Sequence, residues 1–327
     1  MGPAKIVILD GATLNPGDNS WSGLEDLGDV EVYGQSSPEE ILERCTDATV
    51  VVVNKVLLTR DFFSRLPSVK FVAVTATGWD CVDAVAATDH GVVVSNVPVY
   101  GTDSVSQFTM ALILELCHHV GSHGTAVQAG EWGASKNFSF WKTPLIELAG
   151  RTLGVVGFGR IGRRVGELAH AFGMTVLAYS PSRLDAPCYE SFAWSGLDEL
   201  LAASDIISLH CPLTPGTKGL IHRNRLQMFR PHALLINTSR GGLIIEADLA
   251  EALNNDWLAA AAVDVVSQEP LQPDNPLLMA KNCLITPHIA WATLAARRRL
   301  MSTTVENIAN FFAGTPSNVV TNIAARS

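Results

Sequence analysis

Residues 152–172 read TLGVVGFGRIGRRVGELAHAF, and their pattern indicates the architecture of the chain around them. A short apolar run leads into glycines at 157, 159 and 162, which open a segment of helical period. Gly157 permits a tight turn, Gly159 lets the backbone approach a pyrophosphate, and Gly162 lets the helix pack against the strand. The start of the helix adds N–H groups and the positive end of a dipole. The spacing therefore predicts a strand, a turn and a helix that together bind a dinucleotide.

The alternation of short β-branched runs with longer helical stretches extends in both directions from this turn. It is typical of parallel βαβ units, whose strands are buried on both faces and read as continuous apolar runs. Before the turn, strands are predicted at 6–9, 30–33, 50–53, 71–74 and 92–95, with helices at 38–45, 59–66 and 82–89. From the turn onwards, strands are predicted at 152–156, 175–179, 206–210, 233–237, 260–265 and 283–286.

Length and composition limit the classes of protein that remain. The chain has 327 residues, which is more than one hydrophobic core usually serves and suits two domains. With 47% hydrophobic and only 17% charged residues, it is not a disordered chain. A net charge of -9 and the lack of a long Lys/Arg tract argue against nucleic acid and membranes as partners. The first apolar run is too short for a membrane span or signal peptide, so we expect a cytoplasmic protein.

A long helix is predicted over 102–120, with Thr102, Asp103 and Ser104 as candidates for its N-cap. Glu115, His119 and His123 recur every four residues and would share one helical face, as metal ligands can. Nothing in the chemistry inferred below requires an ion, so we expect no metal site there.

Two further segments stand apart from the strand pattern. Residues 121–150 contain several glycines together with Trp132 and Trp141, which predicts an irregular arm that contacts a partner subunit. A last helix is predicted over 293–313, and its basic run at 297–299 is expected on a solvated face.

Three polar residues follow the last three predicted strands in turn, namely Arg240, Glu269 and His288. Ligands of open α/β sheets bind at the carboxyl ends of strands, so these side chains are expected at one ligand-binding edge. Hydride reduction of a ketone leaves negative charge on its oxygen, which a His can protonate. A carboxylate would orient that His, and an Arg would bind the carboxylate and carbonyl of a 2-oxo acid.

The strand predicted at 175–179 leads to the position that decides between NAD and NADP. An acidic residue there would bind the ribose 2′-hydroxyl of NAD. This chain instead has Ser180, followed by Pro181, Ser182 and Arg183. A hydroxyl and a guanidinium suit a 2′-phosphate, because Arg binds phosphate through a fork of N–H donors. We therefore favour NADP(H) over NAD(H) as the cofactor, and use of both stays open.

Motifs along essentially the whole chain resemble those of the D-isomer-specific 2-hydroxyacid dehydrogenase family, above all its glycerate dehydrogenase (hydroxypyruvate reductase) branch. They are KIVILDGATLNPGDNSW (5–21), NVPVYGTDSVSQFTMALILEL (96–116), GRTLGVVGFGRIG (150–162), LHCPLTPGTKGLI (209–221), LLINTSRGGLIIEADL (234–249), AAVDVVSQEP (261–270) and TPHIAWAT (286–293). The resemblance implies two doubly wound parallel-sheet domains with the active site where they meet. A Rossmann NAD(P)-binding domain, residues 102–291, would be inserted into a flavodoxin-like substrate domain, residues 1–101 and 292–327. The arm, about 121–150, would join a homodimer.

The resemblance also implies roles for individual residues. Arg240 would bind substrate, His288 would be the acid/base catalyst, and Glu269 would pair with His288. Backbone N–H groups of Ala76, Thr77 and Gly78 would hold the substrate carboxylate. Trp291 would shape the pocket or belong to the subunit contact, and Asp264 would lie near the nicotinamide carboxamide. The residues implied to contact the cofactor are Thr102, Gly157, Phe158, Gly159, Arg160, Ile161, Gly162, Ser180, Ser182, Arg183, His210, Cys211, Pro212, Thr217, Thr238, Ser239, Asp264 and His288.

The leading hypothesis is an oxidoreductase that transfers a hydride between NAD(P)H and a small 2-oxo acid. That acid would be hydroxypyruvate, giving D-glycerate, or glyoxylate, giving glycolate. One alternative is a D-2-hydroxyacid dehydrogenase for another 2-oxo acid such as pyruvate. An alternative from another class is a nucleotide-sensing binding protein like the transcriptional corepressors of the same architecture. Its partner-binding extensions are missing from this sequence, which argues against it.

Overall fold

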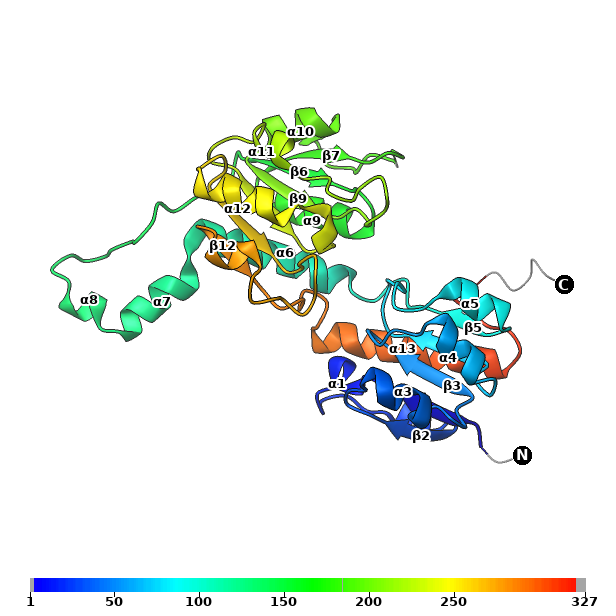
Figure 1. Ribbon diagram of the computed structural model, residues 1–327. Coiled ribbons are helices and arrows are strands. Elements are labelled where there is room, and N and C mark those ends of the chain that lie inside the picture. Colours follow the sequence, from blue (N-terminus) through cyan, green and yellow to red (C-terminus); the bar gives the residue numbers. More distant parts are fainter. Residues whose placement is uncertain (1–2, 184, 322–327) are drawn as a thin grey trace. The chain divides into compact units, whose positions relative to one another are not determined.

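The chain divides into two compact units in the structure, a computed structural model that describes residues 3–183 and 185–321. Unit 1 comprises Met1–Gly101 and Ala292–Ser327, and unit 2 comprises Thr102–Trp291. Each unit contains one parallel sheet with helices on both faces (Figure 1). The predicted α/β class with two parallel-sheet domains is confirmed.

Unit 1 contains a five-stranded sheet in the order β2-β1-β3-β4-β5. This is the flavodoxin-like order, in which the direction of winding reverses between β1 and β3. β3 and β4 are buried at every position because helices cover both faces of the sheet. The strands are β1 (Lys5–Ile8), β2 (Asp29–Val32), β3 (Val50–Val53), β4 (Phe71–Val74) and β5 (Val93–Ser95).

Helices from both ends of the chain cover the sheet of unit 1. One face carries α3, α4 and α5, whose apolar side chains form one cluster with the strands. The other face carries α13, where Phe311 stacks on Phe71 of β4 with ring centroids 4.6 Å apart. Beyond α13, the Val320 N–H donates to the carbonyl oxygen of Val94, so the C-terminal segment is part of this unit. The helices are α1 (Gly11–Leu14), α2 (Ser22–Glu25), α3 (Pro38–Arg44), α4 (Arg60–Arg65), α5 (Ala84–Asp89) and α13 (Leu294–Phe312).

The prediction that the basic run of the last helix lies on a solvated face holds for Arg298 and Arg299, which are exposed, and is wrong for Arg297. The residue is only 7% exposed. Its guanidinium forms a two-pronged ion pair with Asp18, with N–O distances of 2.5 and 2.6 Å, and also donates to the carbonyl oxygens of Leu14 and Ala292. The positive charge therefore fixes the loop after α1 to the start of α13.

Unit 2 contains a seven-stranded sheet in the order β12-β11-β10-β9-β6-β7-β8. Counted from β6, this is the Rossmann order 3-2-1-4-5-6 with one more parallel strand at the far edge. The strand β8 was not predicted, because a three-residue edge strand gives too short an apolar run. The strands are β6 (Thr152–Val156), β7 (Thr175–Tyr179), β8 (Phe192–Trp194), β9 (Ile206–Leu209), β10 (Leu234–Asn237), β11 (Ala260–Val263) and β12 (Cys283–Ile285).

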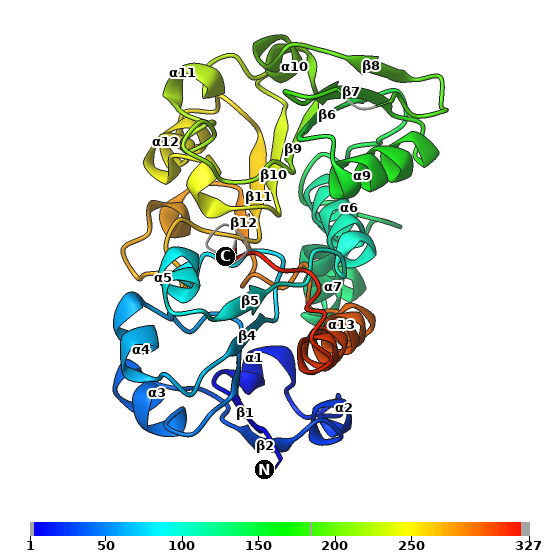
Figure 2. The same ribbon diagram turned by 90° about the vertical axis from the view of Figure 1, so that its right-hand side faces the viewer.

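Two apolar clusters hold the helices of unit 2 on opposite faces of its sheet, as Figure 2 shows. α6 and α9 pack on one face, and α10, α11 and α12 pack on the other. Among the described residues, no helix is both long and apolar enough to cross a membrane. The helices are α6 (Thr102–His118), α7 (Val120–Gln128), α8 (Glu131–Ala134), α9 (Arg160–Ala171), α10 (Leu197–Ala203), α11 (Arg223–Leu226) and α12 (Glu246–Asn254), with the 3₁₀ turns η1 (Gly241–Leu243) and η2 (Pro276–Met279).

The predicted helix over 102–120 ends early, and the predicted irregular arm is partly helical. His119 adopts a left-handed backbone with φ 48°, which ends α6 and lets α7 begin with a new axis. Glu115, His119 and His123 therefore do not share one continuous helical face. Thr102, the first residue of α6, also lies inside the helix rather than at its cap, and Ser104 bonds instead to the carbonyl oxygen of Ala290.

Candidate active site

In the glycine turn at 157–162 of unit 2, two of the three glycines lie against other backbone atoms. Gly157 has φ 97°, and a Cβ there would lie 2.5 Å from the backbone nitrogen of Cys211. A Cβ on Gly162 would clash with the carbonyl oxygen of Gly157. A Cβ on Gly159 would meet nothing within 4 Å. Gly157 and Gly162 are thus required by packing, whereas Gly159 faces open space at the start of α9.

A row of free backbone donors follows the first glycine. Among the residues that the structure describes, none accepts a hydrogen bond from the N–H groups of Phe158, Gly159, Arg160 or Ile161. Four free donors at the start of a helix fit a pyrophosphate. The Phe158 side chain takes no part in this, because it is fully buried and lies 5.0 Å from the ring of Phe192.

The segment after β7 carries the residues expected to distinguish NADP from NAD. Ser180 is half-buried, and Ser182 and Arg183 are exposed. The Arg183 guanidinium lies over the ring of Trp194 at 5.9 Å. Within residues 3–183 and 185–321, no carboxylate lies within 4.0 Å of it. This edge of the site therefore presents hydroxyls and an unneutralised cation, which fit a 2′-phosphate.

The loop after β9 contains four of the residues implied to contact the cofactor. The Ser208 hydroxyl is 2.8 Å from Nε2 of His210, and burial lowers the pKa of His210 to about 4, so that this ring is neutral. The Thr217 hydroxyl donates to the carbonyl oxygen of Pro212 and closes the loop. Cys211 is buried, and its carbonyl oxygen accepts a hydrogen bond from the Ser239 hydroxyl.

Two residues after β10 link this loop to the neighbouring elements of unit 2. The Ser239 hydroxyl bonds to Cys211 at 2.7 Å. Thr238 is buried, and its hydroxyl lies 3.0 Å from the hydroxyl of Thr109 in α6. Thr102, at the start of the same helix, is half-buried. The side chains of Thr238 and Ser239 are therefore engaged within the protein. The Ser239 backbone is engaged as well, because its N–H donates to Oδ1 of Asn237 at 3.0 Å and its carbonyl oxygen accepts from Nη1 of Arg240.

Arg240, Glu269 and His288 follow β10, β11 and β12, which are adjacent parallel strands. Because such strands lie about 4.8 Å apart and end at the same edge, their trailing loops meet there. The first two loops pack closely, since a Cβ on Gly241 would clash with the backbone of Val266. The Val266 N–H in turn donates to Oε1 of Glu269 at 3.2 Å. The backbone beside Arg240 thus contacts the segment that holds the Glu269 carboxylate.

His288 pairs with Glu269 through a hydrogen bond of 2.7 Å between Nδ1 and Oε2. This bond directs Nδ1 to the carboxylate and leaves Nε2 as the ring nitrogen for a ligand. The backbone of His288 is left-handed, with φ 56°, a conformation that non-glycine residues adopt only under local constraint.

Asp264 supplies that constraint, a role that the sequence reasoning missed. Its carboxylate, 1% exposed, accepts hydrogen bonds from the Thr286 hydroxyl at 2.6 Å, the Ile289 N–H at 2.9 Å and the Ala290 N–H at 2.8 Å. Burial raises the pKa of Asp264, and these three bonds oppose the rise. The carboxylate thus holds both sides of the loop that presents His288.

Arg240 is half-buried, and its Nη1 donates to the carbonyl oxygen of Ser239 at 2.8 Å. Over the described part of the chain, no carboxylate lies within 4.0 Å of its guanidinium. A guanidinium has five N–H donors, so most of those of Arg240 remain available to an anion. Trp291, three residues after His288, is half-buried.

In unit 1, the loop Ala76, Thr77 and Gly78 follows β4, which lies between β3 and β5 in the sheet. No described residue accepts a hydrogen bond from the backbone N–H groups of these three residues. Free N–H groups in succession form a concavity that suits a carboxylate. The structure therefore leaves donors at the loop that the resemblance assigns to the substrate.

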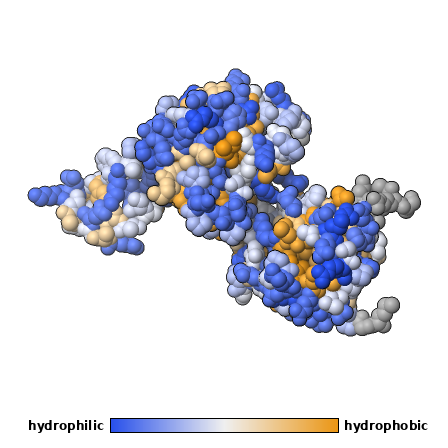
Figure 3. All heavy atoms as spheres, viewed as in Figure 1, coloured by the Kyte–Doolittle hydropathy of each residue, from blue (hydrophilic) through white to orange (hydrophobic). Residues whose placement is uncertain are grey.

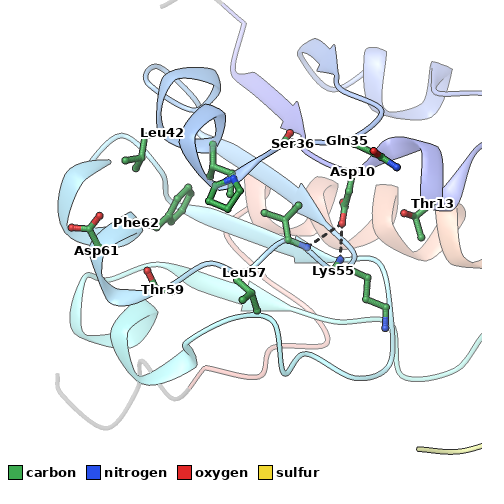
Figure 4. Close-up of a pocket in the computed structure, with 13 residues that line it drawn as sticks. Asp10, Thr13, Gln35, Ser36, Leu42, Lys55, Leu57, Thr59, Asp61 and Phe62 are labelled. Atoms are coloured by element: carbon green, nitrogen blue, oxygen red, sulfur yellow. Dashed lines mark hydrogen bonds between the residues drawn. The ribbon is translucent and has the colours of Figure 1, made fainter. Parts of the chain in front are cut away.

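A separate cavity of about 660 Å³ lies in unit 1, at the carboxyl ends of β1, β2 and β3 (Figure 4). Its walls include Asp10, Leu42, Leu57 and Phe62, and hydrophobic residues are exposed on this unit in Figure 3. The residues of the loop 76–78 are not among its walls. Sequence reasoning did not find this cavity, because its walls come from three separate segments, within 10–13, 35–42 and 55–62.

Comparison with known proteins places these features in a family. The family model for the D-isomer specific 2-hydroxyacid dehydrogenase, NAD binding domain, matches residues 110–290. A hydroxypyruvate reductase of Blautia hydrogenotrophica is 48% identical over 319 residues, which cover 97% of this chain and 99% of that protein. A glycerate dehydrogenase of Methylorubrum extorquens is 37% identical, covering 97% of this chain and 98% of that protein.

A solved structure shares the fold over the same length. An acyclic imino acid reductase in complex with NADPH and D-Arg aligns with a TM-score of 0.83 and 28% identity, covering 97% of this chain and 99% of that one. The predicted family is confirmed. With its dinucleotide turn, and with an imidazole and a guanidinium at the same sheet edge, the chain is an enzyme that uses a nicotinamide cofactor and belongs to the D-isomer-specific 2-hydroxyacid dehydrogenase family.

Proposed function

We propose that this enzyme reduces hydroxypyruvate to D-glycerate, and glyoxylate to glycolate, with NADPH preferred to NADH. The observation that carries the proposal is the 2.7 Å bond from Glu269 to His288, at the same sheet edge as Arg240. Support for the substrate comes from the names of the relatives in Blautia and Methylorubrum, a hydroxypyruvate reductase and a glycerate dehydrogenase.

In the proposed mechanism, Arg240 binds the 2-oxo acid and polarises its carbonyl. The guanidinium is suited to this because its fork of donors can reach the carbonyl and carboxylate oxygens together. From unit 1, we assign the free N–H groups of Ala76, Thr77 and Gly78 to the substrate carboxylate. Positive charge and donors at these points stabilise the charge that develops on the carbonyl oxygen during reduction.

His288 completes the reduction by donating a proton from Nε2 to the carbonyl oxygen. Glu269 keeps Nδ1 occupied, so the ring is fixed in orientation and its reactive nitrogen is defined. When bound, NADPH supplies the hydride that the carbonyl carbon accepts. We assign its pyrophosphate to the free N–H groups at 158–161 and its 2′-phosphate to Ser180, Ser182 and Arg183. In the reverse direction, His288 removes the proton from the 2-hydroxyl group.

The first prediction concerns substrate and cofactor choice. Oxidation of NADPH and of NADH should be followed with hydroxypyruvate, glyoxylate, pyruvate and 2-oxoisocaproate. We expect kcat/KM to be highest with hydroxypyruvate and NADPH. Turnover of none of the four acids would refute the proposed function, and a best rate with pyruvate or 2-oxoisocaproate would refute the proposed substrate.

The Arg183→Ala variant tests whether Arg183 binds the 2′-phosphate of NADPH. Arg183→Ala should raise the KM for NADPH by about tenfold to a hundredfold and leave the KM for NADH unchanged, because a charge-assisted bond to phosphate is lost. Arg164→Ala is the matched control, since Arg164 is exposed on α9 and pairs with Glu167. Equal effects on NADPH and NADH would contradict the assignment.

We also propose that residues 121–150 join two copies of the chain. The segment exposes several large apolar side chains, with exposed fractions of 49% for Trp132, 93% for Phe138 and 65% for Trp141. The Trp132 indole donates to the carbonyl oxygen of Phe138 at 2.9 Å, which stiffens the segment. Large rigid aromatic side chains of this kind anchor protein interfaces.

The second prediction tests this interface. Phe138→Glu combined with Trp141→Glu should convert a dimer into a monomer in sedimentation velocity, because two charges would be buried at the contact. Val85→Glu is the control, since Val85 is 68% exposed on α5, outside the segment. A double variant that sediments like the unaltered protein would contradict the proposed interface.

A further inference from the structure

The loop after β4 has three consecutive carbonyl groups bound by donors of unit 1. The carbonyl oxygen of Thr75 accepts from Nδ2 of Asn54 at 2.6 Å. That of Ala76 accepts from the Val97 N–H at 3.0 Å, and that of Thr77 accepts from Nδ2 of Asn96 at 2.7 Å. Each of the three peptide groups is therefore held in one orientation by a partner elsewhere in the unit.

Peptide geometry then decides where the next N–H groups point. In a planar trans peptide, the N–H of one residue lies opposite the carbonyl of the residue before it. Because the carbonyls of 75, 76 and 77 face donors of the unit, the N–H groups of Ala76, Thr77 and Gly78 face away from those donors. None of these three N–H groups has an acceptor among the described residues.

Asn54 is itself held by a buried carboxylate. It is 5% exposed, and its N–H donates to Asp10, with distances of 2.8 and 3.0 Å to the two carboxylate oxygens. Asp10, 7% exposed, also accepts from the N–H groups of Lys55 at 2.6 Å and Val56 at 3.2 Å, as Figure 4 shows for Lys55. Asp10 follows β1, Asn54 follows β3 and Thr75 follows β4, so a chain of buried bonds connects three strand ends.

We infer that Asn54 is a positioning residue for the substrate: its carboxamide turns the Thr75 peptide so that the free N–H groups of the 76–78 loop are directed at the carboxylate of the 2-oxo acid. Asp10 keeps the Asn54 backbone in place, and Asn96 orients the other end of the loop. Asn54 does not touch the substrate in this arrangement. The inference rests on the proposed function, because it requires the loop to bind a carboxylate.

Asn54→Asp tests the inference with almost no change of shape. The substitution replaces the Nδ2 donors with an oxygen that faces the Thr75 carbonyl oxygen. The hydrogen bond that orients the peptide between Thr75 and Ala76 is therefore lost. We expect the KM for hydroxypyruvate to rise about tenfold, while kcat changes less than threefold and the Kd of NADPH is unchanged. Contacts made equally in the ground and transition states affect KM alone, and one buried hydrogen bond corresponds to about that factor.

Two further variants separate positioning from loss of stability. Asn54→Ala should raise the KM less than Asn54→Asp does, because it removes the donor without adding repulsion. Thr304→Val is the matched control: Thr304 is 1% exposed, and its hydroxyl bonds to the carbonyl oxygen of Leu300 within α13. It should lower the melting temperature and leave the KM unchanged. A KM that follows melting temperature across all three variants would overturn the inference.

Binding of oxamate, a carboxylate that resembles a 2-oxo acid, gives a readout that does not require turnover. Calorimetry on the NADPH complex should show an affinity about tenfold lower for Asn54→Asp than for the unaltered protein. If the unaltered protein turns over no 2-oxo acid but binds oxamate with this difference, the proposed function fails and the inference stands. Unchanged oxamate affinity and KM in Asn54→Asp would overturn the inference, as would absence of oxamate binding to the unaltered protein.

Discussion

Replacing His288 is expected to lower kcat with hydroxypyruvate by about 10³-fold while the Kd of NADPH changes less than twofold. The loss follows because no other group would protonate the carbonyl oxygen as the hydride arrives. His288 has φ 56°, so His288→Asn is the better variant: Asn tolerates the left-handed backbone and cannot act as the acid. Steady-state kinetics and a fluorescence titration with NADPH measure the two effects.

His232→Ala is the matched control for this prediction. His232 also pairs with a carboxylate, that of Asp205 at 2.7 Å, but it precedes β10 and so lies at the opposite edge of the same sheet. Its removal should leave kcat unchanged. If His288→Asn keeps more than a tenth of the turnover, or if it loses NADPH binding in parallel, His288 is not the acid.

Replacing Arg240 is expected to have a comparable effect on kcat/KM. Arg240→Ala should lower it by about 10²–10³-fold, since a preorganised donor to the developing oxyanion is lost. Arg240→Lys should recover little of this loss, because an ammonium keeps the charge but cannot form the planar fork. Added guanidinium should partly restore the activity of Arg240→Ala, which identifies the missing group.

Arg225→Ala controls for the loss of a cation from unit 2. Arg225 pairs with Asp198 and donates to the carbonyl oxygen of Leu220, so its guanidinium is already engaged within unit 2. It should affect stability alone. An Arg240→Ala protein with kcat/KM within fivefold of the unaltered protein would show that substrate binding depends on other groups.

Much of the fold could be predicted from local sequence pattern. Strands such as β3 and β4 are short, apolar throughout and bounded by polar segments, so their existence and length follow from burial on both faces. The glycine turn was predictable for a different reason, since Gly157 and Gly162 each answer a separate steric demand within the protein. These features depend on residues close together in the chain.

The features that escaped prediction depend on tertiary contacts. The glycines at 121 and 124 indicate a loop, yet α7 forms there after His119 turns the backbone. Arg297 looks like a surface residue of a basic run, and only its pairing with Asp18, 279 positions away, explains its burial. No local pattern contains such a partner.

In the candidate site, too, some residues could be predicted from local sequence and others depend on tertiary contacts. Arg240, Glu269 and His288 could be found because each follows a recognisable strand, and the order of strands brings them to one edge. The roles of Asp264 and Asn54 could not be found, because each acts on a backbone group far along the chain: Asp264 on 289 and 290, and Asn54 on Thr75. Sequence reasoning identifies reactive side chains more readily than the groups that hold peptide bonds in place.

The composition of unit 1 from both ends of the chain has a consequence for how the protein is made. A ribosome makes residues 1–101 before unit 2, but α13, which stacks on Phe71, and Val320, which bonds to Val94, are made after unit 2. Unit 2 is continuous, so all of its residues are available as soon as Trp291 has emerged. The nascent chain can therefore complete its nucleotide-binding half first, while the half that carries the 76–78 loop waits until the residues of α13 and Val320 have been made.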